Sequence, residues 1–80
     1  MMTQNIYWCY EKGGWGGLFV LAETRGKAKQ LFADEIECRY IDVRTRIMQR
    51  GVNSLFSYVI DEADSPLLKK YNLEYREEEE

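Results

Sequence analysis

The sequence of 80 residues predicts a small α+β domain with a three-stranded antiparallel sheet of ββαβ order, one packed helix and one or two short helical segments near the C-terminus. Three observations support this. Two aromatic and β-branched runs flank a glycine-rich turn, an amphipathic helix follows, and residues 39–48 alternate in polarity. We expect one domain over residues 1–76 and a disordered acidic tail over residues 77–80.

The first two strands are expected to form a hairpin. Residues 6–10 (Ile-Tyr-Trp-Cys-Tyr) have strand composition, and residues 18–22 are apolar on both faces, as in a central strand. Between them lie four glycines around Trp15, and glycine tolerates the positive φ that turns require.

A helix is predicted over residues 25–36. Thr24 suits the N-cap position, and Gly26 weakens the first turn by up to about 1 kcal/mol relative to Ala. The apolar stripe of this helix should pack on Val43, Ile47 and side chains of the second strand (Phe19 and Leu21, or Val20), and it consists of Ala28, Leu31, Phe32 and Ile36.

The third strand is predicted over residues 39–48, and Gly51 is expected to end it. One face carries Ile41, Val43, Thr45 and Ile47, whereas the other carries Asp42, Arg44, Arg46 and Met48. Residues 54–63 fit both a helical stripe and a strand, with the helix favoured. Ser65 followed by Pro66 predicts a short helix from Leu67 to Tyr71.

The composition argues against catalysis. The chain has no histidine, and a catalytic cysteine needs a base beside it, so Cys9 and Cys38 are read as structural thiols. Two cysteines without further ligands make no zinc site, and we expect no metal and no cofactor. We therefore expect a binding protein and not an enzyme.

The same composition predicts a location inside a cell. The N-terminus lacks the basic and apolar regions of a signal peptide, and no apolar run approaches the roughly 20 residues of a spanning helix. We expect a cytoplasmic protein with reduced thiols and no membrane partner.

Three features could bind a partner. Trp15, between glycine pairs, is either an aromatic anchor for another protein or a ring folded back on the hairpin. Arg44 and Arg46 could read phosphates or carboxylates, with tyrosines and Trp8 as stacking platforms, or could simply face solvent. The net charge of −3 argues against a nucleic-acid partner.

The third feature is the acidic C-terminal part. Residues 1–60 carry eight Lys/Arg against six Asp/Glu, for a net +2, and residues 61–80 carry three against eight, for −5. Asp61, Glu62 and Asp64 with the glutamates of residues 77–80 could imitate a nucleic-acid backbone for a basic groove on a partner. The alternative is that these acids serve only solubility.

Residues 22–29 (Ala-Glu-Thr-Arg-Gly-Lys-Ala-Lys) and 40–46 (Tyr-Ile-Asp-Val-Arg-Thr-Arg), in hairpin–helix–strand order, resemble small proteins of phages and prophages of Gram-positive bacteria. The resemblance spans roughly residues 6–50 and implies a phage origin in a host cytoplasm, but no activity. Our hypothesis is a phage accessory protein that binds a host or phage protein, for example to inhibit a defence or nucleic-acid-handling complex. The alternatives are nucleic-acid binding by Arg44 and Arg46, and a structural homo-oligomer such as a homodimer.

Overall fold

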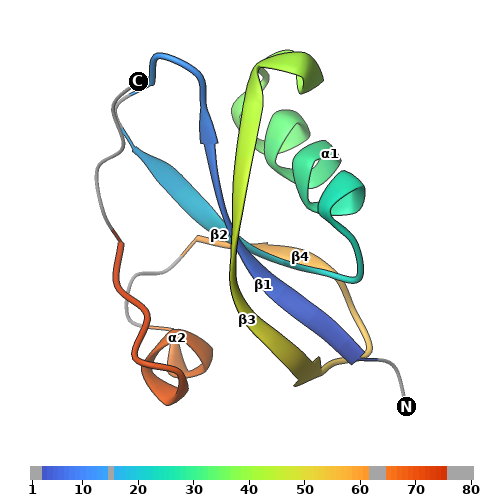
Figure 1. Cartoon of the computed structure of the whole chain (residues 1–80), viewed down its shortest axis with the longest axis vertical. Coiled ribbons are helices and arrows are strands. Elements are labelled where there is room, and N and C mark those ends of the chain that lie inside the picture. Colours follow the sequence, from blue (N-terminus) through green and yellow to red (C-terminus); the bar gives the residue numbers. More distant parts are fainter. Residues whose placement is uncertain (1–2, 15, 62–64, 76–80) are drawn as a thin grey trace.

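The computed structural model describes residues 3–14, 16–61 and 65–75 and shows a small α+β fold. The antiparallel sheet has four strands in the order β3-β1-β2-β4, one more than the sequence predicted (Figure 1). The elements are β1 (Thr3–Glu11), β2 (Gly17–Ala22), α1 (Arg25–Ile36), the 3-10 turn η1 (Tyr40–Asp42), β3 (Val43–Asn53), β4 (Tyr58–Ile60) and α2 (Pro66–Lys70). The expected hairpin is present, because β1 pairs with β2 in an antiparallel register.

Both faces of the sheet are covered. On one face α1 packs to form a helix-side core, and on the other α2 and residues 71–75 form a C-terminal-side core (Figure 1). The helix-side core has the buried residues Tyr7, Cys9, Val20, Ala22, Ala28, Phe32, Ala33 and Val43. The C-terminal-side core has Ile6, Trp8, Phe19, Leu21, Val52, Ile60 and Leu68.

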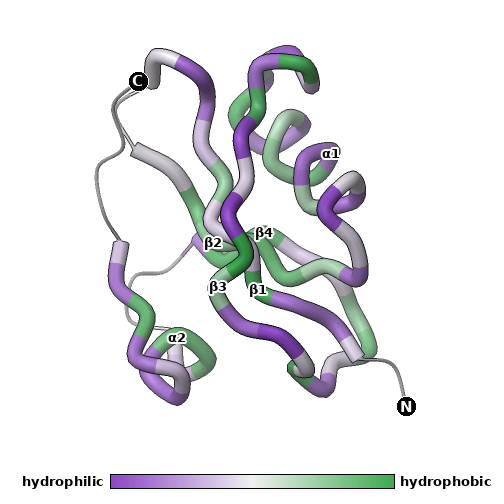
Figure 2. The backbone as a smooth tube through the Cα atoms, viewed as in Figure 1, coloured by the Kyte–Doolittle hydropathy of each residue, from purple (hydrophilic) through white to green (hydrophobic). Residues whose placement is uncertain are grey.

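This double cover explains the unbroken apolar runs of β1 and β2. Successive strand residues point to opposite faces, so a strand buried on both sides reads as continuously apolar. Ile6 and Trp8 face the C-terminal-side core, whereas Tyr7 and Cys9 face α1. Figure 2 shows apolar segments of β1, β2 and β4 meeting at the centre, while much of β3 is hydrophilic.

Helix α1 has the predicted bounds. The Thr24 Oγ1 accepts a hydrogen bond from the Lys27 amide (3.1 Å), as an N-cap should, and the helix ends at Glu37, whose φ is 58°. Ala28 and Phe32 pack with Val20 and Val43 as predicted, and Leu31 packs against them together with Ile47. Of the two alternatives for the second strand, Val20 is therefore correct and Phe19 with Leu21 is not, because those two side chains face the C-terminal-side core.

The end of the predicted helical stripe is also different. Ile36 is 39% exposed, and the buried position is taken by Ala33. Because the alanine side chain is small, the last turn of the helix can lie close to the sheet while the Ile36 side chain faces solvent.

The third strand, β3, begins and ends later in the sequence than predicted. Residues 40–42 form a 3-10 turn instead of strand, and Ile41 is 69% exposed. The strand then runs past Gly51, which does not end it, since its φ of 73° is a backbone conformation that glycine adopts at bulges. The β1–β3 register is indeed irregular between Gln4 and Tyr7, opposite this part of β3.

The prediction that favoured a helix over residues 54–63 is wrong, since Tyr58–Ile60 form the strand β4. This strand pairs antiparallel with β2, with Ile60 opposite Phe19. Pairing there supplies hydrogen bonds to backbone groups along the edge of β2. The short helix after Ser65 is confirmed as α2, and the Ser65 Oγ accepts from the Leu67 amide.

Candidate functional site

An exposed apolar loop joins β3 to β4. We call residues 54–57 the apolar loop, because it presents Leu55 and Phe56 to solvent, 71% and 74% exposed. Tyr58, the first residue of β4, adds a ring that is 44% exposed. Leu55 and Phe56 are the two most exposed large apolar side chains among the described residues, which makes the loop a candidate interaction surface.

Polar contacts hold the apolar loop in shape. Gln4, only 1% exposed, donates from Nε2 to the Ser54 carbonyl (3.1 Å) and accepts at Oε1 from the Ser57 hydroxyl (2.7 Å). The Ser54 Oγ in turn accepts from the Phe56 amide (3.3 Å) and donates to the Phe56 carbonyl (2.9 Å). Both ends of the loop are therefore fixed to β1, and the two apolar side chains are presented from an ordered turn.

Sequence reasoning missed this loop. It assigned Leu55 and Phe56 to the buried stripe of a helix, because adjacent apolar residues are most often buried. The signal that could have identified the loop is the local sequence Asn-Ser-Leu-Phe-Ser at residues 53–57, in which small polar residues typical of turns flank the apolar pair.

We predict that Gln4→Leu destabilises the fold by about 1–3 kcal/mol, since a leucine fills similar space but leaves the Ser54 carbonyl without its donor. Urea unfolding measures this loss, and amide hydrogen exchange of Phe56 should accelerate because the loop loses its anchor. Gln49→Leu is the matched control, because among the described residues the Gln49 side chain bonds just the adjacent Arg50 carbonyl. Equal losses in the two variants would contradict the anchoring role of Gln4.

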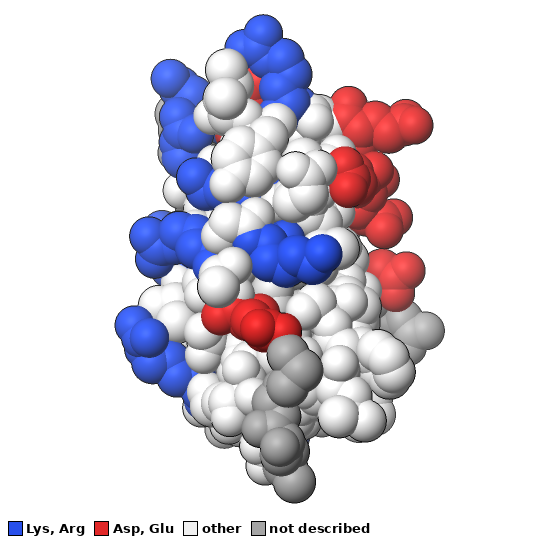
Figure 3. Space-filling view, turned by 90° about the vertical axis from the view of Figure 1, so that its right-hand side faces the viewer, with Lys and Arg blue, Asp and Glu red and all other residues white. Residues whose placement is uncertain are grey.

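The two edges of the sheet differ in character. Edge strand β3 carries Arg44, Arg46 and Arg50 and no acidic residue, whereas edge strand β4 has no charged residue between Tyr58 and Ile60. In Figure 3, Lys and Arg gather mostly on the left and Asp and Glu mostly on the right. A groove of about 250 Å³ lies along β4 and is lined by Tyr58, Val59, Ile60, Asp61 and Ser65.

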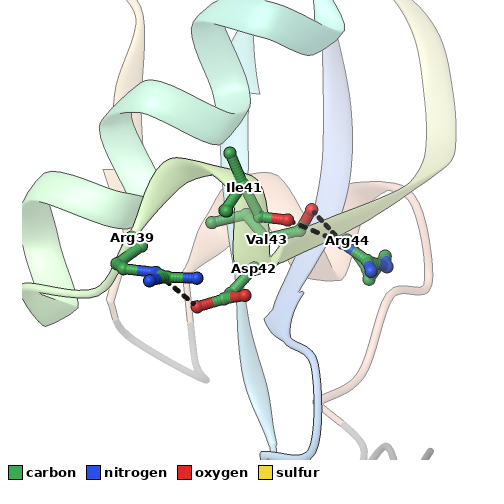
Figure 4. A network of polar contacts seen from close by, with 5 residues as sticks. All are labelled: Arg39, Ile41, Asp42, Val43 and Arg44. Carbon is green, nitrogen blue, oxygen red and sulfur yellow. Dashed lines mark hydrogen bonds and ion pairs between the residues drawn. The ribbon is translucent and has the colours of Figure 1, made fainter.

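Arg44 and Arg46 lie on one face of the sheet, as predicted. Their positions pair with Tyr10 and Trp8 of β1, so they share the C-terminal-side face. The Arg44 Nη1 donates to the carbonyls of Ile41 (3.0 Å) and Val43 (3.3 Å), while Arg39 forms an ion pair with Asp42 beside it (Figure 4). Arg44 is therefore already engaged with the backbone at the start of β3.

The suggestion that Trp8 could stack on a base is wrong. Its ring is fully buried and packs on Phe19 at a centroid distance of 4.8 Å. Stacking on a base would need an exposed ring. Here the C-terminal segment covers that face of the sheet.

Of the other predicted site residues, the structure describes only Asp61. Asp61 is exposed and directly follows β4. Trp15, Glu62 and Asp64 lie outside the described residues, as do the glutamates of residues 77–80. The structure thus brings Asp61 to the β4 groove, apart from the arginines on β3.

The two thiols are poor nucleophiles. Burial raises the pKa of Cys9 to about 12, and Cys9 is a small buried hydrophobe as predicted. Burial, and then the carboxylates of Glu11 and Asp42, raise the pKa of Cys38. Both groups stay protonated at neutral pH, which is the unreactive form.

Comparisons with known proteins add no family to this picture. No protein-family model, no curated protein and no solved structure matches the chain. Within residues 3–14, 16–61 and 65–75, no cluster of three or more His, Cys, Asp or Glu could hold a metal ion. In the same ranges no helix has the length and apolar character needed to cross a bilayer. The apolar loop and the neighbouring β4 groove are the features on which a function can be built.

Proposed function

We propose that this chain is a protein-binding domain whose main contact is the apolar loop. The observation that carries the proposal is that Leu55 and Phe56 are more than two-thirds exposed, at 71% and 74%, although their loop is anchored at both ends. Removing apolar surface from water is favourable by roughly 25 cal/mol per Å² before the entropic costs of association are subtracted. Because the loop is already ordered, binding loses less conformational entropy than it would with a flexible segment.

The partner that we propose follows from the resemblance of residues 22–29 and 40–46 to small phage proteins. The chain would be a phage-encoded accessory protein in the host cytoplasm, bound to a host or phage protein. Inhibition of a defence or nucleic-acid-handling complex is one form that this function would take. The supporting geometry is a surface suited to recognition, with thiols whose raised pKa values keep them unreactive.

The test compares two variants that both fold like the original chain. Leu55→Ser with Phe56→Ser should lower the yield of a cross-linked host partner at least tenfold, because truncation of central contacts costs about 2 kcal/mol or more. Ile41→Ser is the matched control, because Ile41 is 69% exposed but lies in η1, which precedes the opposite end of β3. Circular dichroism confirms that both variants fold. Equal yields from the two variants would refute the proposed role of the loop.

A second candidate is nucleic-acid binding along β3. It is favoured by the three arginines of β3 and its lack of acidic residues, although the chain carries a net −3. Binding should appear as a gel shift at low salt that weakens as salt rises and when Arg44 and Arg46 are both changed to Ala. The absence of any shift at low salt would exclude this candidate.

A further inference from the structure

We propose that β4 accepts a fifth strand from the partner protein, an extended segment with alternating apolar side chains and a Lys or Arg that meets Asp61. This inference rests on the proposed function, because it specifies how the region around the apolar loop recognises its partner. The added strand would lie in the groove along Tyr58–Ile60. The side chains of Leu55 and Phe56, at one end of β4, would cover its apolar residues.

The first support is the contrast between the two sheet edges. Soluble proteins protect sheet edges with charged side chains and bulges. Strand β3 has both devices, since it carries three arginines and an irregular register with β1. Strand β4 has neither, and its exposed side chain is the aromatic Tyr58. The edge without charged side chains or a bulge, although it is only three residues long, is the one more open to strand addition.

The second support is the backbone of β4. Among the described residues, β4 pairs with β2 alone, and Tyr58–Ile60 make no backbone hydrogen bond outside that pairing. The hydroxyl of Tyr75 donates to the Ile60 carbonyl, which leaves Tyr58 and Val59 for an incoming strand. Successive strand residues direct their N–H and C=O groups to opposite sides, so one of these two residues faces away from β2.

The third support is charge. From residue 51 to residue 68 the sequence contains no Lys or Arg but three acids, Asp61, Glu62 and Asp64. Asp61 is exposed and lines the groove. A second copy of this chain, pairing β4 with β4, would bring only the same cation-free stretch to Asp61. A partner segment with a cation is complementary, and complementary charge directs which strand binds and in which register.

The test uses random peptides of about twelve residues, long enough for a typical five- to six-residue strand. Selection on the immobilised chain should enrich peptides with apolar residues at alternate positions and Lys or Arg near one end. Asp61→Lys should weaken a selected peptide at least tenfold, and a peptide with Glu in place of its cation should regain binding to that variant. The matched control Asp34→Lys changes an exposed acid of α1 and should alter affinity less than twofold.

Amide hydrogen exchange identifies the binding mode directly. In the complex, an amide of Tyr58 or Val59 should exchange at least tenfold more slowly. Strand addition would be overturned by unchanged exchange at these amides or by a selection that enriches no alternating peptides. It would also be overturned by sedimentation that shows a dimer which the selected peptide does not dissociate. A partner that requires Leu55 and Phe56 but leaves β4 exchange unchanged would overturn this inference alone. A partner indifferent to those two residues would overturn the proposed function.

Discussion

Replacement of Trp8 by Ala is expected to destabilise the fold by about 3–5 kcal/mol, the usual loss for truncating a large buried aromatic side chain. The Trp8 ring is fully buried and lies 4.8 Å from Phe19 and 5.9 Å from Tyr75, between ring centroids. This loss is a large fraction of the about 5–15 kcal/mol that stabilises a typical domain, so the urea midpoint should fall sharply. Urea unfolding followed by circular dichroism measures the loss.

Trp8→Phe is the matched control for that prediction. The Trp8 Nε1 is buried and has no hydrogen-bond partner among the described residues. Phenylalanine keeps most of the ring and removes this unsatisfied donor, so the loss should be well below that of the alanine variant. If the two variants lost equal stability, ring packing would not be the source of the effect.

Gly17→Ala is the second large effect, with an expected loss of about 3 kcal/mol or more, at the upper end for overpacking. A Cβ at Gly17 would lie 2.1 Å from the Cys9 carbonyl oxygen and 3.1 Å from the Tyr10 Cβ. A backbone oxygen in a paired strand cannot move as a side chain can, so the β1–β2 ladder itself must shift. Urea unfolding gives the loss, and hydrogen exchange of the hairpin amides shows where the ladder opens.

The control for Gly17 is a glycine with room around it. A Cβ at Gly26, in the first turn of α1, would meet only the Tyr40 hydroxyl at 3.5 Å. Gly26→Ala should therefore stabilise the fold by up to about 1 kcal/mol, the helix propensity difference. A loss at Gly26 similar to that at Gly17 would show that the clash with Cys9 is not the cause.

The elements that could be predicted from the sequence are those specified locally. Helix α1 has its N-cap Thr24, helix α2 has Ser65 and Pro66, and the hairpin has its glycine turn. Each signal lies within a few residues of the element that it starts or ends, so no knowledge of the tertiary structure is needed.

The elements that escaped prediction depend on distant partners. Strand β4 has only three residues, and its identity comes from the edge of β2, about forty residues earlier in the chain. The apolar loop escaped for the same reason, since its anchor is Gln4, which is 50 residues from Ser54 in the sequence. Periodicity alone could not distinguish Leu55 and Phe56 from core residues, because it assumes that apolar side chains become buried.

The cover over Trp8 also determines when the domain can complete its folding during synthesis. The side chains that close this face, Leu68, Tyr71 and Tyr75, are translated some sixty residues after the tryptophan that they cover. Until residues 65–75 leave the ribosome, the aromatic surface around Trp8 stays uncovered. A chain truncated after β4 should therefore be bound by chaperones, whereas a chain that includes residues 65–75 should not be.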